Sequence, residues 1–381
     1  MRKLLIISFF ALLSACGGKE SESKEPGNIL ENLTYSVDTV VVDPGDNLLS
    51  IANYSQLQGS SSLSQDQTIF YLFDNKDHRI AVVDLDQLKL LEFLPFEAEG
   101  PDGVGQYAQG LQVLADRNFL ITNFQSSGIF NREGKKLENF KLNDAEFKGL
   151  EISSPFSSGL LMSTDRKWLF SLSGLYNDAA KDLVKLDPKQ KTGEAIDLPA
   201  LDIADDFGIS LLSNEGSMIY IEQSNLDEIN GRLYISNKVT SAIYRYDYQL
   251  DSLELFTFQH SLVANEKTGT VKNEVSSKEA LFEEMAKVTT QIGFEKLLWD
   301  EERKLFFRLG TKLLNSSIDE NVTNKFDVYL FAYDENLNLL GEKLLENLLN
   351  PPRFYFLKDG KLWSYVNVED ELGFAIFTFD F

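Results

Sequence analysis

The sequence predicts an all-β fold, a six-bladed β-propeller of four-stranded antiparallel blades. Three observations predict it. A short turn followed by an apolar strand recurs six times, an apolar segment ending in Asp or Asn follows each turn, and the last unit lacks a strand that the N-terminal region can supply. Recurrence at this scale is typical of propellers, in which radial repetition leaves only short strand edges.

The six turns are short and polar, and an apolar strand begins directly after each of them. The first apolar residues of these strands are Ile69, Phe119, Trp168, Leu233, Leu305 and Leu362, at spacings of 50, 49, 65, 72 and 57 residues. Asp, Asn and Gly tolerate the backbone conformations of tight turns, and β-branched or aromatic residues favour strands. The pattern therefore predicts a β-hairpin at each turn.

A second apolar segment follows each hairpin turn and ends in Asp or Asn. These ends are Asp84, Asn131, Asp187, Asp247, Asp334 and Asp380. After the first five, another short turn leads to a further strand, for example at residues 137–142 and 253–258. Each unit is therefore expected to hold four strands. A β-sandwich or a two-domain β protein, in which the spacing would be coincidental, is the alternative.

The two ends of the chain complete this prediction. The sixth unit stops at Phe381, directly after its third strand, and residues 33–43 form a strand-like segment that belongs to no unit. We expect this segment to be the outer strand of the last blade, because it would otherwise leave an unpaired edge there.

The first residues of the chain indicate export and a lipid anchor. Two basic residues precede ten apolar residues (4–13), a run too short to span a bilayer. Leu13, Ser14 and Ala15 then lead to Cys16, and this segment resembles a bacterial lipobox. The resemblance implies a lipoprotein signal peptide (1–15) and acylation including palmitate at Cys16. The polar residues that follow predict a flexible tether (16–32) to the propeller domain (33–381). An ordinary secretory signal is the alternative.

The composition excludes several functions. The chain has 36 basic and 59 acidic residues and a formal net charge of −23, which disfavours binding to nucleic acids. Its one cysteine rules out an internal disulfide, and its two histidines leave little material for a zinc or iron site.

Long connections are expected on one face of the propeller, where second strands lead to third strands and one blade leads to the next. Long loops on a rigid scaffold commonly carry binding sites. The candidate ligand-face residues at these positions are Asp74, Asp102, Asn123, Asn237, Arg308 and Tyr365. A helical insertion near 276–290, with Leu281, Phe282, Met285 and Val288 on one face, would either pack on the rim or serve as a lid.

The sequence shows no motif for nucleophilic catalysis, so no catalytic residue is assigned. Asp202, Asp205 and Asp206 are close together on the long-loop face and are the candidates for a calcium site. No other cofactor is expected.

Three sequence motifs resemble a known family. They are the lipobox, the segment Ile-Ala-Val-Val-Asp-Leu-Asp followed by Glu-Gly-Pro-Asp-Gly-Val-Gly, and the segment Leu-Leu-Trp-Asp-Glu-Glu-Arg-Lys-Leu-Phe-Phe-Arg at residues 297–308. Together they resemble a family of Gram-negative outer-membrane lipoproteins of unknown function with a TolB-like six-bladed propeller. The resemblance implies this fold and an outer-membrane location but no catalytic residues.

These observations favour a membrane-anchored binding or interaction module in the cell envelope, with an unidentified protein, small molecule or glycan as its ligand. One alternative is a propeller enzyme, a carboxylate- or calcium-dependent hydrolase of carbohydrates or lactones. Another is a structural subunit of a cell-envelope complex. Convergence of the candidate side chains on a channel would favour the enzyme.

Overall fold

The computed structural model describes residues 27–49, 54–123, 127–140, 147–150, 160–174, 178–179, 181–213, 216–314 and 324–381. The expected signal peptide, Cys16 and most of the expected tether lie outside these residues.

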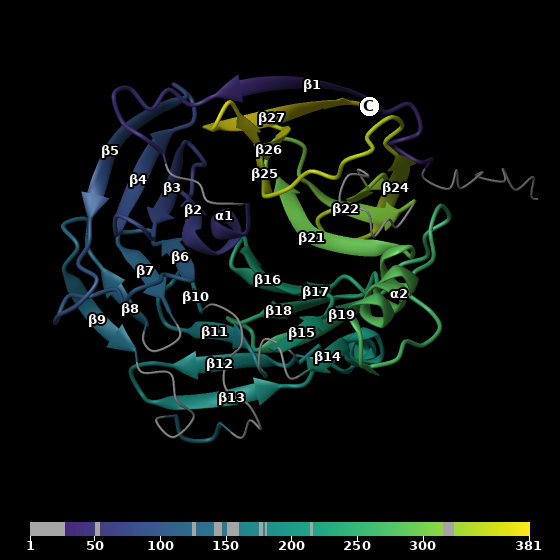
Figure 1. Cartoon of the computed structure of the whole chain (residues 1–381), viewed down its shortest axis with the longest axis horizontal. Coiled ribbons are helices and arrows are strands. Elements are labelled where there is room, and N and C mark those ends of the chain that lie inside the picture. Colours follow the sequence, from purple (N-terminus) through teal and green to yellow (C-terminus); the bar gives the residue numbers. More distant parts are fainter. Residues whose placement is uncertain are drawn as a thin grey trace, which may run out of the picture.

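The described residues form six four-stranded antiparallel sheets and one three-stranded sheet. Figure 1 shows the four-stranded sheets following one another around a common centre. Five of them consist of four consecutive strands. These are β2 (Ser61–Leu63), β3 (Ile69–Asp74), β4 (Arg79–Asp84) and β5 (Lys89–Pro95); β6 (Gly110–Val113), β7 (Phe119–Thr122), β8 (Ser127–Phe130) and β9 (Lys136–Phe140); β10 (Leu161–Met162), β11 (Leu169–Leu172), β12 (Leu183–Asp187) and β13 (Thr192–Ile196); β16 (Ser224–Ile229), β17 (Arg232–Asn237), β18 (Ile243–Asp247) and β19 (Ser252–Phe256); and β21 (Gly293–Asp300), β22 (Leu305–Leu313), β23 (Phe326–Tyr333) and β24 (Leu339–Leu344).

The remaining four-stranded sheet joins the two ends of the described chain. It contains β25 (Tyr355–Lys358), β26 (Lys361–Val368), β27 (Glu371–Asp380) and, as its outer strand, β1 (Thr34–Val41). β1 runs antiparallel to β27, from the pair Thr34 and Asp380 to the pair Val41 and Gly373 (Figure 1). The expected pairing of residues 33–43 with the last unit is therefore confirmed.

The six hairpin turns that the sequence predicts lie between the first and second strands of the six sheets. The hydrogen bonds that stabilise these turns join residues of the same turn. Asp66 accepts a hydrogen bond from the backbone N–H of Thr68 (3.2 Å), and Asp116 accepts the equivalent bond from Asn118 (3.1 Å). At least one residue in each turn adopts a left-handed backbone, for example Arg117 at φ 64°. Short polar side chains stabilise such turns by bonding to the backbone two residues further along.

The acidic and amide residues at the ends of the third strands have a similar structural role. Asp84 accepts backbone hydrogen bonds from Asp86 (2.9 Å) and Gln87 (2.8 Å), and Asp187 accepts them from Lys189 (2.9 Å) and Gln190 (2.8 Å). These side chains close the turn to the fourth strand. The periodic Asp and Asn residues are thus explained by turn formation.

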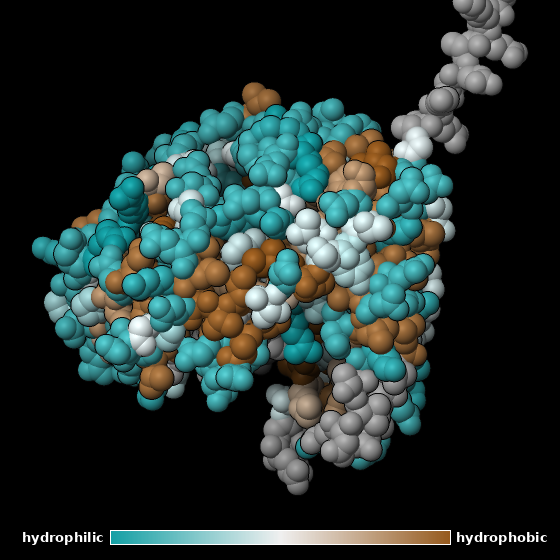
Figure 2. Space-filling view, turned by 90° about the horizontal axis from the view of Figure 1, so that it is seen from above, coloured by the Kyte–Doolittle hydropathy of each residue, from teal (hydrophilic) through white to brown (hydrophobic). Residues whose placement is uncertain are grey.

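The hydrophobic core lies between neighbouring sheets. One cluster combines Phe307 and Leu309 of β22 with Leu357 of β25 and Phe377 of β27, and another combines residues of β3 and β4 with residues of β6 and β7. The side view in Figure 2 shows a largely hydrophilic surface with hydrophobic side chains gathered across its middle. Each sheet buries its faces against the next sheet around the centre.

The long spacings before and after the fourth unit are explained by an inserted sheet, whose strands lie between β13 and β16 and between β19 and β21. The three-stranded sheet consists of β14 (Ile209–Ser213), β15 (Gly216–Tyr220) and β20 (Glu274–Val275). Only one helical insertion was expected, but the described residues also contain α1 (Tyr54–Ser60) and the 3-10 helix η2 (Pro199–Phe207). η2 occupies a segment that was expected to be a loop, because Pro199 begins a stretch whose Leu201, Ala204 and Phe207 are buried.

The expected helical insertion is α2 (Lys278–Thr289), and Ser277 caps it by accepting a hydrogen bond from the Ala280 N–H (3.2 Å). Leu281 and Val288 are buried as expected, but Phe282 is 39% exposed. Glu284 is buried instead, because it accepts hydrogen bonds from the Lys272 N–H (3.1 Å) and the Lys287 ammonium (2.6 Å).

Candidate functional site

A cavity of about 590 Å³ is lined by the first strand of each four-stranded sheet. The contributing residues include Leu63 of β2, Leu111 of β6, Leu161 of β10, Leu226 of β16, Lys296 of β21 and Phe356 of β25. We call this space the channel cavity. Six segments distant in sequence therefore present side chains to one enclosed space, which is the usual setting for a small-molecule site.

An unpaired carboxyl group lies on one side of the channel cavity. Asp227 of β16 takes part in no hydrogen bond or ion pair with any described residue. Burial raises its pKa, and the positive charge of Lys296 opposes that effect only in part. Tyr355 is close by, and burial together with the charges of Glu295 and Asp227 raises the pKa of its hydroxyl well above 10. A carboxyl group with a raised pKa in a cavity is a typical feature of functional sites.

The other side of the channel cavity presents amides and hydroxyls. Gln58 and Gln109 line it, and their side-chain amides make no hydrogen bond to described residues; Ser224 lines it as well. Glu228, in contrast, is held in place because it accepts hydrogen bonds from the Thr164 N–H (3.0 Å) and the Tyr248 hydroxyl. The cavity thus combines fixed walls with polar groups that are free to bind a ligand.

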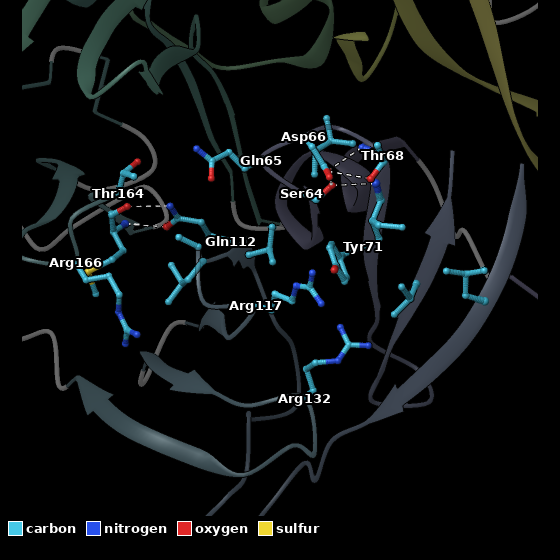
Figure 3. A pocket seen from close by; sticks show the side chains of 18 of the residues that line it. Ser64, Gln65, Asp66, Thr68, Tyr71, Gln112, Arg117, Arg132, Thr164 and Arg166 are labelled. Carbon is cyan, nitrogen blue, oxygen red and sulfur yellow. Dashed lines mark hydrogen bonds between the residues drawn. The ribbon is translucent and has the colours of Figure 1, made fainter. Parts of the chain in front are cut away.

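A second, larger cavity of about 950 Å³ adjoins the channel cavity and shares Leu63 and Gln112 with it. Its walls come mainly from the turns after β2, β6 and β10 (residues 64–68, 114–117 and 162–166) and include Arg132 of the turn after β8 (Figure 3). We call it the turn pocket. It lies at the ends of the sheets where the connections are short, opposite the long loops on which the sequence analysis placed the ligand face.

A third cavity of about 410 Å³ is acidic and includes two of the three calcium candidates. Asp202 and Asp205 line it together with Asp182, Asp197 and Lys181, whereas Asp206 does not. Burial, and then the charges of neighbouring aspartates, raise the pKa of Asp182 and of Asp202. The part of the chain that the structure describes contains no group of three or more His, Cys, Asp or Glu residues placed to hold a metal ion. Calcium binding stays an untested prediction.

Three ligand-face candidates at the ends of second strands are engaged in closing loops. Asp74 accepts a hydrogen bond from the Lys76 N–H (2.9 Å) and lies 3.5 Å from the Arg79 guanidinium. Asn123 donates to the Val104 carbonyl (2.5 Å). Asn237 is completely buried, donates to the Leu201 carbonyl (3.0 Å) and accepts from the backbone N–H groups of Val239 (3.0 Å) and Thr240 (3.2 Å).

The Asp102 side chain also has a structural role. It accepts a hydrogen bond from the Lys136 N–H (3.0 Å) at the start of β9. Its loop is closed on itself by bonds from the Val104 N–H to Glu97 (2.8 Å) and from the Gly105 N–H to Ala98 (3.0 Å). A side chain at Gly103 would lie 2.8 Å from the Ala98 carbonyl, so glycine is needed there.

Arg308 is brought next to Asn237, but neither residue lines any of the three cavities. The Arg308 guanidinium is completely buried and donates to the carbonyls of Glu295 (2.6 Å), Ser241 (2.7 Å) and Asn237 (3.3 Å). Burial lowers its pKa. Tyr365 lies apart from them, packed against the cluster of β3, β4 and β26 side chains, and burial raises its pKa. The six candidates therefore do not converge on one of these cavities.

The sequence analysis missed Asp227, Lys296 and Gln109. A signal for Asp227 and Lys296 was present, because each is a charged residue within the first strand of a unit. First strands surround the centre, so a charged residue there faces either the channel cavity or a buried partner. Gln109, directly before β6, carried no comparable signal.

Comparison with solved structures supports the fold. A DUF4221 family member from Bacteroides vulgatus superposes with a TM-score of 0.65 at 11% identity, covering 91% of this chain and 98% of that one. A protein from Bacteroides fragilis that is described as exported superposes with a TM-score of 0.52 at 10% identity, covering 91% and 96%. Identities this low show the fold alone.

No curated protein matches the chain. No helix among the described residues is long and apolar enough to cross a membrane. A family model described as a domain of unknown function, DUF4221, matches residues 26–344. The expected membership of a family of unknown function is thereby confirmed at this level: the chain belongs to the DUF4221 family.

Proposed function

We propose that this chain is a six-bladed β-propeller that binds a small polar ligand in its channel cavity and is held in the cell envelope by a lipid on Cys16. The propeller assignment is supported by the six four-stranded sheets around a common centre, whose first strands all line that cavity. The pairing of β1 with β27 supports closure of the last blade by the N-terminal strand.

The unpaired Asp227 carboxyl in the channel cavity is the observation that carries the binding proposal. Asp227 is partly buried, its surroundings disfavour the charged carboxylate, and a ligand hydroxyl or amide can bond to it there. Lys296 and the amides of Gln58 and Gln109 offer further donors and acceptors, and Phe354 and Phe356 offer apolar faces. This combination suits a small polyhydroxylated molecule, such as a saccharide.

A binding experiment tests this proposal. Mono- and disaccharides would be screened against the full chain by saturation-transfer NMR, and a hit would be titrated. We expect Asp227→Asn and Gln109→Ala to weaken binding about tenfold or more, because each removes a hydrogen bond to a charged group or an amide in an enclosed site. Asp206→Asn is the matched control, because Asp206 is exposed and lines none of the three cavities. Equal affinities of all three variants would contradict the channel site.

The envelope location is supported by the N-terminal segment and by the likeness to a protein described as exported. Cys16→Ala should release the chain into the soluble fraction, because a lipid anchor of several acyl chains would be lost. Cys16→Ser, which also lacks the thiol, should behave in the same way. Either variant that still pellets with membranes after a salt wash would contradict the anchor.

A hydrolase is the second candidate, because Asp227 has a raised pKa and lies next to Lys296 in a cavity. A carboxyl group with a raised pKa is suited to general acid catalysis. Incubation of the full chain with gluconolactone in a pH-stat would test it. Acid release above the spontaneous rate that Asp227→Asn abolishes would favour the enzyme, and no release above that rate would favour binding alone.

A further inference from the structure

The turn pocket differs from the channel cavity in that it is lined by three arginines. Arg117, Arg132 and Arg166 come from three different turns, and their side chains border one space of about 950 Å³ (Figure 3). The chain as a whole has a net charge of −23. Three guanidinium groups in one cavity are therefore unusual for this protein. Guanidinium groups bind carboxylates and phosphates through paired hydrogen bonds.

Two of these arginines have partners within the protein and one does not. Arg132 pairs with Glu92 (2.6 Å), and Arg166 pairs with Asp116 and with Glu138 (3.4 Å). The Arg117 guanidinium makes no hydrogen bond and no ion pair with any residue that the structure describes. In a chain with 59 acidic residues, none of the described carboxylates is placed to neutralise it.

Tyr71 of β3 provides a second, independent observation. Its side chain is only 4% exposed and packs edge-on against Phe119, with ring centroids 5.3 Å apart. Its hydroxyl lies at the pocket wall and has no hydrogen-bond partner among the described residues. Figure 3 shows this hydroxyl directed towards the space that Arg117 and Arg132 enter. A hydroxyl that faces a cavity and has no partner within the protein can donate a hydrogen bond to a ligand oxygen.

The rest of the wall is partly apolar and partly polar. Ile69, Val82, Leu91, Leu114 and Met162 line the pocket between the polar turns, and the carboxylates Asp66 and Glu92 also border it. The pocket therefore offers hydrocarbon surface beside its donors, an arrangement that suits molecules with one charged end and an apolar body.

We propose that the turn pocket binds a small organic anion. The ligand's carboxylate or phosphate oxygens accept hydrogen bonds from the Tyr71 hydroxyl and the Arg117 guanidinium, and the apolar part packs against Ile69 and Val82. This site goes beyond the proposed function, because it is a different cavity with different donors and a different class of ligand.

Calorimetric titration of the full chain with charged and neutral probes of the same size tests this inference. Benzoate and phenyl phosphate are the charged probes, and benzamide is the neutral match of benzoate. We expect both anions to bind at least tenfold more tightly than benzamide. The anion that binds more tightly shows whether the pocket prefers a carboxylate or a phosphate.

Arg117→Gly removes the guanidinium without disturbing the turn, because Arg117 has a left-handed backbone (φ 64°) that glycine adopts freely. We expect it to weaken anion binding at least tenfold while the melting temperature stays equal or rises. Tyr71→Phe, which removes only the hydroxyl, should weaken anion binding several-fold and leave benzamide unaffected. Lys304→Gly is the matched control, because Lys304 has the same left-handed backbone (φ 55°) in the equivalent turn after β21 and lies outside the pocket.

Three outcomes would overturn the inference. Benzamide binding as tightly as benzoate would remove the role of charge. Unchanged anion affinity in Arg117→Gly would remove the role of this arginine, whatever the stability of the variant. The absence of measurable heat with every probe at millimolar concentration would show that the pocket is not an anion site. None of these outcomes bears on saccharide binding in the channel cavity.

Discussion

The polar side chains singled out at the two ends of the sheets differ in their partners. At the long-loop end, Asp74, Asn123, Asn237 and Arg308 all bond to loop backbone or to a neighbouring side chain. At the short-turn end, the Arg117 guanidinium and the Tyr71 hydroxyl have no partner among the described residues, and both line the turn pocket. The four long-loop residues thus stabilise the fold, whereas the two groups at the turn pocket can bond to a ligand.

The difference has a simple physical cause. A long irregular loop has backbone N–H and C=O groups that no sheet satisfies, so nearby side chains must bond to them. A short turn satisfies its own backbone with one Asp side chain, as Asp66 and Asp116 do. The remaining side chains of the turn are then available to a ligand. Loop length alone therefore does not tell which end of the sheets has polar side chains available to a ligand.

The largest expected effect is on the stability of the long-loop end. Arg308→Met should lower the free energy of unfolding by about 3 kcal/mol, because three buried carbonyls lose their donor. Urea unfolding measures it. Arg117→Gly, which removes an arginine at the short-turn end, is measured for comparison. Equal losses in the two variants would break the contrast between the two ends.

A second substitution at the long-loop end should lower the free energy of unfolding somewhat less. Asn237→Ala removes one donor bond and two acceptor bonds within the loop after β17, and we expect a loss of about 2 kcal/mol. Asn118→Ala, in the short turn after β6, is the matched control and should change stability by less than about 0.5 kcal/mol. Thermal unfolding of both variants measures these losses. A greater loss of stability in Asn118→Ala than in Asn237→Ala would contradict the expectation.

Asp227→Asn should increase stability at neutral pH, by an amount on the order of 1 kcal/mol. Burial raises the pKa of Asp227 above the ordinary value of 3.8, so the folded state holds a proton that the unfolded state releases. The stability that this group contributes is complete below the unfolded value and is lost as the pH rises through the folded value. The gain in Asp227→Asn should therefore be present at pH 7 and vanish near pH 3.5.

Melting temperatures of wild type and Asp227→Asn across this pH range measure the effect. Asp206→Asn, at an exposed position, should follow the wild type at every pH. A gain that is the same at pH 7 and pH 3.5 would show that titration of Asp227 is not its cause.

The smallest expected effect is at the short-turn end. Arg117→Gly should increase stability by roughly 0.5 kcal/mol, because relief of the left-handed backbone slightly exceeds the entropy that glycine loses on folding. Lys304→Gly should give a similar or smaller gain, since it also breaks an ion pair with Glu301. Differential scanning calorimetry can resolve the two. A clear loss in Arg117→Gly would mean that this side chain supports the fold rather than a ligand.

Much of the fold could be predicted from the sequence, because its signals are local. The six hairpin turns, the Asp and Asn residues that end the third strands, and the strand at residues 33–43 all lie where they were expected. The inserted three-stranded sheet was missed, because its β20 is only two residues long and pairs in parallel with a strand far away in sequence. The burial of Glu284 on α2 was not predicted either, because its partner Lys272 lies outside the helix.

The sequence by itself determined the turn chemistry, the strand periodicity and the unmatched N-terminal strand, since each depends on residues that are neighbours along the chain. Only the tertiary structure decided which polar groups remain unpaired. Asn237 and Tyr71 are both polar residues on second strands, but Asn237 meets the η2 carbonyl of Leu201, whereas the Tyr71 hydroxyl faces a cavity. A side chain is free for a ligand only when no distant segment supplies its partner, and that is decided by how the sheets pack.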